Sequence, residues 1–398
     1  MIARQAQEAV DNGSTTRRMF EEGARLKKIH GADRVFDFSL GNPDLEPPEA
    51  VTAALRETAA DPAPGSHHYM SNAGYPETRA ACARREQRRA GWQEEIPAES
   101  VTMTVGAASA LTCSFFALLD PGDEVIILKP YFSEYFNYLK LRGAVGVAVD
   151  TEAETFQPLA DKIAAAVTKR TKAVLINSPN NPSGAVYTES KLQDLARSLK
   201  DAEAITGRPI YIISDEPYVE IVYDGLPVPS LLNIHPHTLI CYSWSKSFAL
   251  PGERIGYVLV SPRSADYEAL CQAIPLGLRI LGFVNAPAIW QRVIAKTADA
   301  AIEVSEYGVR RDLLMEILHS CGFDCPKPEG AFYLLLPVPD GDDERFAARC
   351  AEENILVVPA AGFGAPGYVR IAYCVDRQVI ERSAAGFRKV AEIYNIAN

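Results

Sequence analysis

The sequence has no excess of basic residues, because 40 Lys and Arg stand against 51 Asp and Glu, for a net charge of −11. Such a chain repels a phosphate backbone, so nucleic acid is not expected as a partner. The 8 cysteines are scattered without C-x-x-C spacing, and nothing resembling a signal peptide precedes them. We therefore expect a reducing, cytoplasmic location. Disorder and collagen-like order are excluded, since 47% of the residues are hydrophobic and 23% are charged.

Other missing motifs exclude further kinds of site. The sequence contains no G-x-x-x-x-G-K-[ST], the phosphate-binding loop of many nucleotide enzymes. Gly362 to Gly367 fits G-x-G-x-x-G, but this stretch contains Pro366 and leads into a strand-like segment, whereas a dinucleotide fingerprint opens a helix. The histidine pairs at 67–68 and 235/237 have no further Cys or His at metal-binding spacing, so we expect no metal.

The charge-free run from Val101 to Leu119 approaches the length of a membrane span. Its first residues alternate as in a buried strand, and Gly106 then opens an Ala/Leu/Phe-rich segment that stops at Asp120. This pattern favours a strand, a tight turn and a buried helix, and we expect no membrane partner.

The middle of the chain repeats a short apolar, β-branched run followed by a turn and a helical stretch. Expected helices include Leu159–Val167 and Glu189–Leu199. Strands are expected at Val101–Val105, Glu124–Leu128, Gly146–Val149, Ala173–Asn177, Ile210–Ser214, Thr238–Ser243 and Gly256–Val260. The alternation predicts an α/β fold with three layers, in which helices cover both faces of a mainly parallel sheet. Ligands of such sheets bind at the carboxyl ends of the strands.

The last hundred residues have a different, α+β pattern. Helices are expected at Tyr307–Ser320 and Asp376–Ile396, and strands at Gly330–Pro337, Ile355–Pro359 and Val369–Val375. We predict a large domain over residues 49–295 and a small domain over residues 296–398, with residues 1–48 forming an arm that packs on the small domain.

Lys246 follows a buried-looking run at Leu239–Ser245, among apolar, hydroxyl and aromatic neighbours. A desolvated lysine has a lowered pKa and is a suitable amine for Schiff-base chemistry. Ser243, Ser245 and Arg254 would supply hydroxyl and guanidinium contacts to a phosphate, and a lysine imine beside a phosphate implies pyridoxal phosphate. Alone, the same lysine is more typical of a charged side chain that reaches solvent near a helix start.

Asp215 ends the strand expected at Ile210–Ser214. A buried carboxylate there would keep the nitrogen of a pyridoxal ring protonated, as that ring needs in order to accept electrons. Tyr218 and Asn181 can donate hydrogen bonds to the ring's phenolate oxygen. In isolation, Asp-Glu-Pro-Tyr is also typical of a turn that begins a helix.

The Ser-x-Ser-Lys motif at Lys246, the later Gly-x-Arg at Arg254 and the segment from Ser39 to Pro43 together resemble the fold type I pyridoxal-phosphate enzymes. Within them the chain is similar to the class I/II aminotransferases of the aspartate and aromatic type. The resemblance implies that Lys246 forms the Schiff base with the cofactor and transfers the proton. It also implies that Asp215 meets the ring nitrogen.

The resemblance assigns further residues. It implies that Tyr218 and Asn181 hold the ring oxygen, and that Arg370 grips the substrate α-carboxylate with help from Gly41. The remaining cofactor contacts it implies are Ser243, Ser245, Arg254, the turn at Ala107 and Ala108, Phe132 on the ring, and Tyr69 reaching the phosphate from a second subunit. A homodimer with shared active sites is therefore expected. Ala108 stands where relatives often have a hydroxyl, so the phosphate ligands at this turn remain open.

The function predicted is transfer of an amino group from an L-amino acid, aspartate-like or aromatic, to a 2-oxo acid such as 2-oxoglutarate by a ping-pong mechanism. The alternative is a pyridoxal-phosphate lyase or another enzyme of the same fold acting on an L-amino acid. Arg279 lies near the position where aspartate-type relatives bring an arginine from the partner subunit, but an arginine with a structural role in an interface fits equally well.

Overall fold

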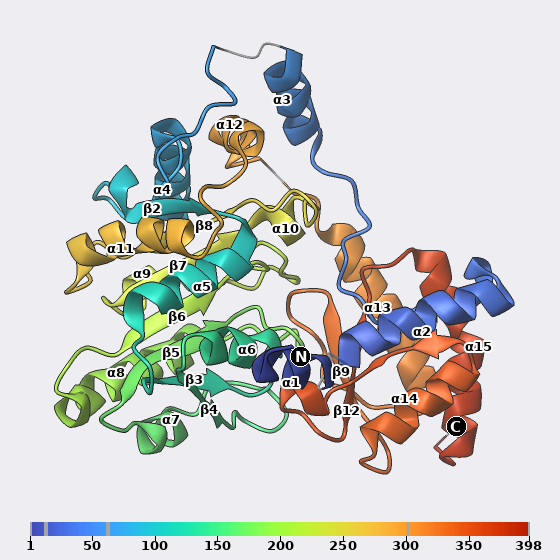
Figure 1. Cartoon of the computed structure of the whole chain (residues 1–398). Coiled ribbons are helices and arrows are strands. Elements are labelled where there is room, and N and C mark those ends of the chain that lie inside the picture. Colours follow the sequence, from blue (N-terminus) through green and yellow to red (C-terminus); the bar gives the residue numbers. More distant parts are fainter. Residues whose placement is uncertain (1, 12–14, 61–63, 301, 397–398) are drawn as a thin grey trace.

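The computed structural model describes residues 2–11, 15–60, 64–300 and 302–396. Its centre is a seven-stranded sheet in the order β2-β8-β7-β6-β5-β3-β4 (Figure 1). The strands are β2 (Val101–Thr104), β3 (Glu124–Leu128), β4 (Val145–Val149), β5 (Thr171–Asn177), β6 (Tyr211–Asp215), β7 (Thr238–Ser243) and β8 (Gly256–Val260). Only β8 runs antiparallel to its neighbours. The predicted three-layer α/β fold with a mainly parallel sheet is confirmed.

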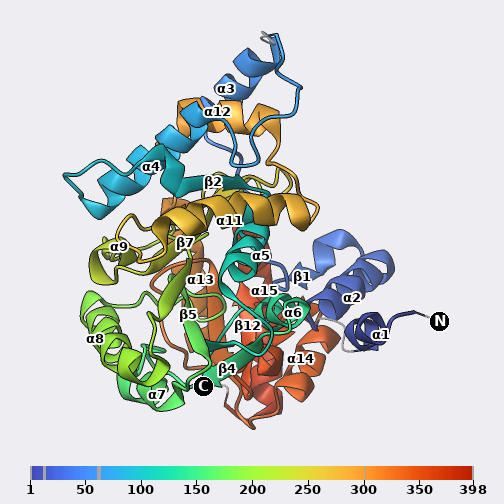
Figure 2. The same ribbon diagram turned by 60° about the vertical axis from the view of Figure 1, so that its left-hand side comes forward.

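Helices cover both faces of this sheet (Figure 2). Side chains at alternate strand positions, such as Ile213 and Cys241, pack with α5 (Gly106–Leu118), α6 (Glu134–Leu141) and α11 (Tyr267–Ile280). The positions between them pack on the other face. The helices there are α3 (Glu49–Ala60), α4 (Pro76–Ala90), α7 (Ala160–Ala166), α8 (Glu189–Thr206), α9 (Leu231–Ile234) and α12 (Ala288–Thr297). Neighbouring residues of one strand therefore face different helices.

The remaining elements surround a second apolar core. An antiparallel sheet contains β11 (Val358–Pro359), β12 (Tyr368–Ala372) and β9 (Tyr333–Pro337), and β1 (Phe36–Asp37) pairs with β10 (Ile355–Leu356). The helices are α1 (Arg4–Asp11), α2 (Thr15–His30), α13 (Ser305–Ser320), α14 (Asp343–Glu352) and α15 (Arg377–Ile393). Phe38, close to the start of the chain, packs on Phe387 near its end. This core therefore joins segments from both ends of the sequence.

The run from Val101 to Leu119 forms β2 and the buried helix α5, joined at Gly106, as its pattern predicts. In the part of the chain that the structure describes, no helix is long and apolar enough to cross a bilayer. The stretch Ile355–Pro359, predicted as one strand, is two short strands that pair in different sheets.

Candidate active site

Asp215 is the last residue of β6 and is buried. Tyr135 on α6 donates a hydrogen bond to its Oδ2 at 2.6 Å, whereas Oδ1 is buried and finds no hydrogen-bond partner among the residues that the structure describes. Burial is the main reason that the pKa of Asp215 is raised to about 7. A carboxylate in this state favours a cationic partner at its free oxygen.

A chain of hydrogen bonds leads from Asp215 to a buried arginine on another strand. The side-chain amide of Asn177 donates to the Asp215 carbonyl at 2.8 Å, and the Asn181 backbone N–H donates to Asn177 Oδ1 at 2.7 Å. Arg370 Nη1 then donates to Asn181 Oδ1 at 3.2 Å. These contacts place Asp215 at one end and Arg370 at the other end of a single polar array.

The guanidinium of Arg370 is held on several sides. Its Nη2 donates to the Ser39 carbonyl at 2.7 Å, and its Cζ lies 4.8 Å and 4.7 Å from the ring centroids of Tyr333 and Phe363. Its Nε is buried, and no atom in the described part of the chain forms a hydrogen bond with it. An oriented arginine with an unused donor is suited to an anionic ligand such as a carboxylate.

Lys246 lies on the short helix α10 (Trp244–Ser247), which begins at the end of β7. Its Nζ donates to the Gly41 carbonyl at 2.6 Å, and burial lowers the pKa of the amine to about 8. A Cβ on Gly41 would lie 1.8 Å from the hydroxyl of Tyr333, so only glycine allows this approach. That hydroxyl is 3.0 Å from the hydroxyl of Tyr218.

The N-terminus of α5 forms a cradle for an anion. The helix begins at Gly106, and Val105 before it supplies no side-chain cap, so the first amides lack helical partners. Arg254 lies over this turn: its Nη2 donates to the Val105 carbonyl at 3.4 Å, and a Cβ on Gly106 would come within 2.8 Å of the same nitrogen. Free helical amides beside a guanidinium favour a phosphate.

Two serines complete this end of the site. Ser243 caps α10 by accepting a hydrogen bond from the backbone N–H of Ser245 at 3.1 Å. Their hydroxyl oxygens are 2.6 Å apart. The Ser-x-Ser-Lys motif thus fixes the orientation of the helix that carries Lys246.

Comparison with known proteins gives the family. The model for aminotransferase class I and II matches residues 33–387. The chain belongs to this family. An aspartate/prephenate aminotransferase of Thermus thermophilus is 35% identical over 361 residues, covering 88% of this chain and 90% of the relative. An aspartate aminotransferase of Thermotoga maritima is 32% identical over 372 residues, covering 92% of this chain and 93% of the relative.

Solved structures agree with this assignment. An amino transferase of Eubacterium rectale has a TM-score of 0.95 and 41% identity, covering 99% of this chain and all of the other. The Thermus thermophilus aspartate aminotransferase with maleate has a TM-score of 0.86 and 32% identity, covering 98% and 99% of the two chains. The protein is therefore a pyridoxal-phosphate-dependent amino acid aminotransferase. The predicted enzyme class and cofactor are confirmed, and lyase chemistry is not favoured.

The side chains of this aminotransferase fit its cofactor. The unpaired Oδ1 of Asp215 is suited to a protonated ring nitrogen, and the α5 amides with Arg254 are suited to a phosphate. Ala108 offers no hydroxyl at this turn, and the hydroxyl of Ser109 donates to the Gly106 carbonyl at 3.1 Å. In this enzyme the turn therefore presents mainly backbone donors.

Three other predicted residues of the aminotransferase lie at or near the surface. Phe132 is half-buried, and its ring centroid is 5.5 Å from that of Tyr135 in an edge-on arrangement. Tyr69 is 91% exposed. Arg279 is exposed in the last turn of α11, and within the described ranges its side chain makes no hydrogen bond or ion pair.

The prediction from sequence missed several aromatic members of the site. Tyr135, Tyr333 and Phe363 contact Asp215 or Arg370 directly, yet aromatic residues in apolar surroundings are typical of any core. Phe363 lies within the Gly-rich stretch 362–367. Phe132 precedes α6 and Tyr135 lies in its first turn, so no helical spacing in the sequence connects the two residues.

Proposed function

We propose that this aminotransferase acts on aspartate-like or aromatic L-amino acids with a 2-oxo acid such as 2-oxoglutarate as acceptor. The observation that carries the proposal is the array from Asp215 to Arg370, which ends at each side in a buried, unpaired polar atom. Relatives named aspartate and aspartate/prephenate aminotransferases support the choice of donors.

In this proposal the cofactor is held by residues from several elements. Asp215 faces its ring nitrogen, Tyr218 and Asn181 its ring oxygen, and Phe132 its ring. The phosphate is held by Ser243, Ser245, Arg254 and the amides of Ala107 and Ala108. When bound, pyridoxal phosphate supplies a conjugated ring that disperses negative charge from the substrate α-carbon.

Lys246 is the proposed covalent attachment point and the group that moves the proton. Its amine is uncharged in a useful fraction of molecules near pH 8, because burial disfavours the ammonium form. Once released by the incoming substrate, Nζ accepts the α-proton and later returns it. The Gly41 carbonyl, 2.6 Å away, orients this nitrogen.

Arg370 is the proposed anchor for the substrate α-carboxylate. Tyr333 and Phe363 hold its guanidinium plane from two directions, and Asn181 and the Ser39 carbonyl fix its Nη atoms. Its Nε, which has no hydrogen-bond partner among the described residues, would be available to donate to the carboxylate. Gly41, which packs directly on the Tyr333 hydroxyl, would let the backbone approach the same carboxylate.

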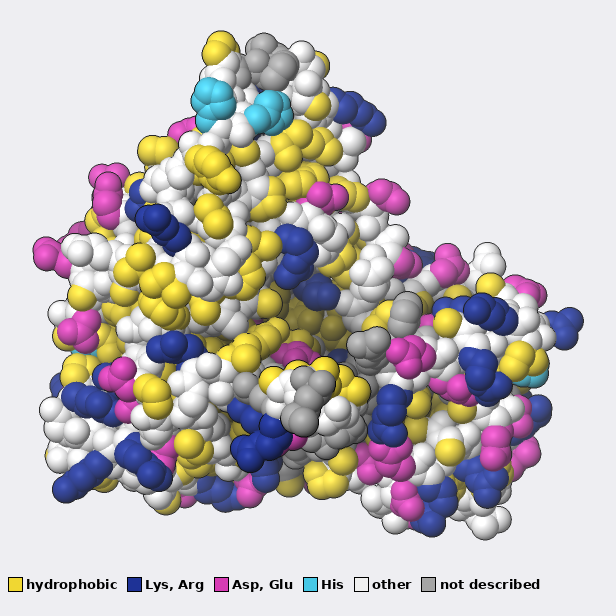
Figure 3. Space-filling view, viewed as in Figure 1, with side chains coloured by type: hydrophobic (Ala, Val, Ile, Leu, Met, Phe, Trp, Pro, Cys, Tyr) yellow, Lys and Arg dark blue, Asp and Glu magenta, His cyan; other side chains and the backbone are white. Residues whose placement is uncertain are grey.

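We also propose a homodimer with shared active sites. Exposed apolar side chains follow one another at the end of α11 and beyond it: Leu276, Ile280, Leu281, Phe283 and Val284. Figure 3 shows apolar side chains gathered over α11 and α12. A contiguous apolar surface favours a protein partner, and an exposed Tyr69 is available to the second subunit. Arg279 is assigned to this interface.

Two further assignments complete the proposal. The division into residues 1–48, 49–295 and 296–398 is supported by the second core, which consists mainly of Phe38 and residues beyond 300 and also takes in Tyr218, Ile221 and Tyr223. A reducing, cytoplasmic location is supported by the eight cysteines, all of which are free thiols.

A half-reaction screen tests the function. The purified protein is loaded with pyridoxal phosphate and mixed with single amino acids, and the cofactor's absorbance is followed. We expect aspartate, glutamate or an aromatic amino acid to convert the aldehyde form to the amine form, and 2-oxoglutarate to reverse the change. Pyruvate or ammonia released without a 2-oxo acid would contradict the proposal in favour of lyase chemistry.

A further inference from the structure

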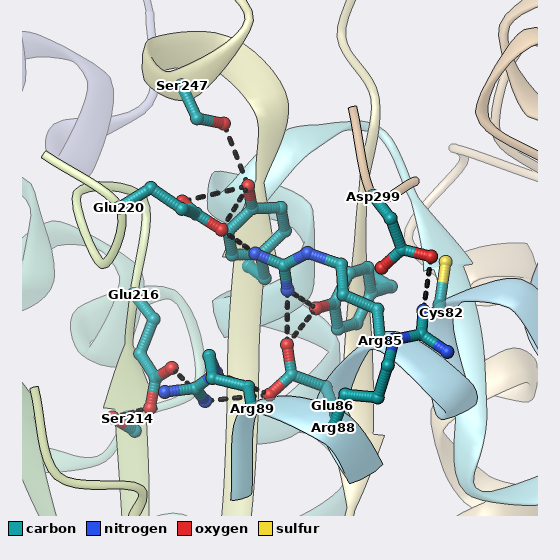
Figure 4. Close-up of polar contacts among 12 residues, drawn as sticks. Cys82, Arg85, Glu86, Arg88, Arg89, Ser214, Glu216, Glu220, Ser247 and Asp299 are labelled. Carbon is teal, nitrogen blue, oxygen red and sulfur yellow. Dashed lines mark hydrogen bonds and ion pairs between the residues drawn. The ribbon is translucent and has the colours of Figure 1, made fainter. Parts of the chain in front are cut away.

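A buried cluster of charged and hydroxyl side chains lies behind the proposed cofactor site (Figure 4). It takes Arg85, Glu86 and Arg89 from α4, and its other members are Ser214, Glu216, Glu220, Tyr242, Ser247 and Tyr257. Ser214 and Asp215 are adjacent on β6, so their side chains point to opposite faces of the sheet. The cluster therefore supports the strand end from the face that the Asp215 carboxylate does not occupy.

One branch of the cluster holds the residues on either side of Asp215. Arg89 Nη2 pairs with Glu216 Oε2 at 2.6 Å, and Arg89 Nε donates to Glu86 Oε2 at 2.9 Å. The Ser214 hydroxyl donates to Glu216 Oε1 at 2.7 Å. Of the two neighbours of Asp215, Glu216 contacts the Arg89 guanidinium directly, and Ser214 is linked to it through the Glu216 carboxylate.

A second branch ends beside Lys246. Arg85 contacts Glu86 and Glu220 and lies 4.0 Å above the ring of Tyr242. The Tyr242 hydroxyl donates to Glu220 at 3.1 Å and lies 2.8 Å from the hydroxyl of Ser247. Ser247 directly follows Lys246. The cluster therefore contacts the sequence neighbours of both proposed cofactor-holding residues, Asp215 and Lys246.

The charges of the cluster are closely balanced. Two guanidinium groups, Arg85 and Arg89, face the carboxylates of Glu86, Glu216 and Glu220. Glu86 and Glu216 are buried. Buried ion pairs add little stability over apolar packing, but the loss of one partner leaves an uncompensated charge whose field extends through a medium of low dielectric constant.

We propose that Glu216 and Arg89 are positioning residues for the bound cofactor, which hold the end of β6 and set the electrostatic environment of Asp215. The inference rests on the proposed role of Asp215. The other titratable groups that face Asp215 are Tyr135 and Tyr138 on α6, Cys241 on β7 and Tyr218 beyond the strand. None of these is cationic. Glu216 is the carboxylate whose charge acts on Asp215, and Arg89 pairs with it.

The test compares Glu216→Gln and Arg89→Gln in the cofactor-loaded enzyme. The readouts are the absorbance of the bound cofactor against pH, and the cofactor affinity of the apoprotein. The midpoint is the pH at which half of the absorbance change of the bound cofactor has occurred. We expect Glu216→Gln to lower this pH and Arg89→Gln to raise it, each by about half to one pH unit. Loss of a nearby negative charge disfavours a cationic ring nitrogen, and loss of a positive charge favours it. Each variant should bind the cofactor about tenfold more weakly.

The matched control is Arg88→Gln. Arg88 lies on the same helix and pairs with Asp299, but both side chains are more than half exposed, so the midpoint should not move. Arg89→Lys keeps the positive charge and should show the wild-type midpoint. If Arg89→Gln does not fold, the shift in Glu216→Gln alone tests the inference. Unchanged midpoints, or midpoints that move in the same direction in both variants, would overturn the inference. If Asp215→Asn itself leaves the titration unchanged, the proposed role of Asp215 fails instead.

Discussion

Asp215 has an unusual environment for a carboxylate. Tyr135 satisfies one oxygen, the other is buried and unpaired, and burial raises the pKa from 3.8 to about 7. A raised pKa in the fold means that the protonated form is favoured there. The protonated Asp215 carboxyl therefore contributes fully to folding stability below about pH 4, and this contribution is lost as the pH rises through 7. Near pH 8 the ionised group destabilises the protein unless a cation is bound.

Asp215→Asn should therefore stabilise the apoprotein near pH 8. We expect a gain of about 2 to 4 kcal/mol in the free energy of unfolding, which disappears near pH 3, where the carboxyl is largely protonated in both states. Urea denaturation of the two apoproteins at both pH values measures this. The exposed Asp120→Asn serves as control. An equal difference at both pH values would show that ionisation of Asp215 is not the cause.

Lys246 leads to a second prediction at this scale. Only an uncharged amine attacks an aldehyde, and burial lowers the pKa of Lys246 from 10.5 to about 8. The rate at which the apoprotein takes up pyridoxal phosphate covalently should rise with pH and level off above about pH 8. Stopped-flow absorbance measures this rate, with Lys246→Ala as the control that forms no bond. A rate still rising steeply at pH 10 would contradict the lowered pKa.

The sequence singles out polar residues at strand ends, but not the aromatic residues that support them. Lys246, Asp215 and Arg370 are conspicuous because charged groups are unusual among apolar runs. Tyr333 and Phe363 are not conspicuous, because an aromatic residue in a core and one packed on a guanidinium have the same sequence surroundings. Only the three-dimensional contacts distinguish them.

At the scale of elements, the turn before α5 is sensitive to a small change. Gly106 has a φ of 76°, and a Cβ there would meet the guanidinium of Arg254. Gly106→Ala should weaken binding of pyridoxal phosphate to the apoprotein about 10- to 100-fold, while binding of pyridoxal, which has no phosphate, changes much less. Fluorescence titration with the two aldehydes measures the difference.

Gly122→Ala is the matched control for this variant. Gly122 has a φ of 90°, so alanine causes similar backbone strain, but no atom lies within 4 Å of the added Cβ. It should lower stability by about 1 kcal/mol and leave both affinities unchanged. If Gly106→Ala weakens the binding of pyridoxal and of pyridoxal phosphate equally, the cause is general damage to the site rather than a lost phosphate contact.

The elements themselves were largely predictable. Three strands, β3, β7 and β8, have the predicted bounds, because β-branched runs between turn residues are a strong local signal. Helix α8 continues beyond its predicted end at Leu199 to Thr206 and stops at Gly207, whose φ of 66° gives a left-handed cap. The division of Ile355–Pro359 depends on partners distant in sequence, which no local pattern encodes.

At the scale of the whole molecule, the apolar surface beyond α11 predicts association. Ile280→Glu combined with Phe283→Ser should convert a dimer to a monomer and lower activity more than tenfold, because buried charge disfavours the interface and Tyr69 no longer reaches a second site. Sedimentation velocity measures the mass, with Ile205→Glu on α8 as an exposed control. A wild-type monomer with full activity would contradict the shared site.

The contact between the Ser39 carbonyl and Arg370 Nη2 joins residues that are synthesised far apart in time. The β1–β10 pair and the packing of Phe38 on Phe387 have the same property. All strands of the central sheet precede codon 370 in the message, so they can pack during translation before Arg370 has been added. The proposed substrate anchor therefore gains its contact with the Ser39 carbonyl only after this sheet has been synthesised.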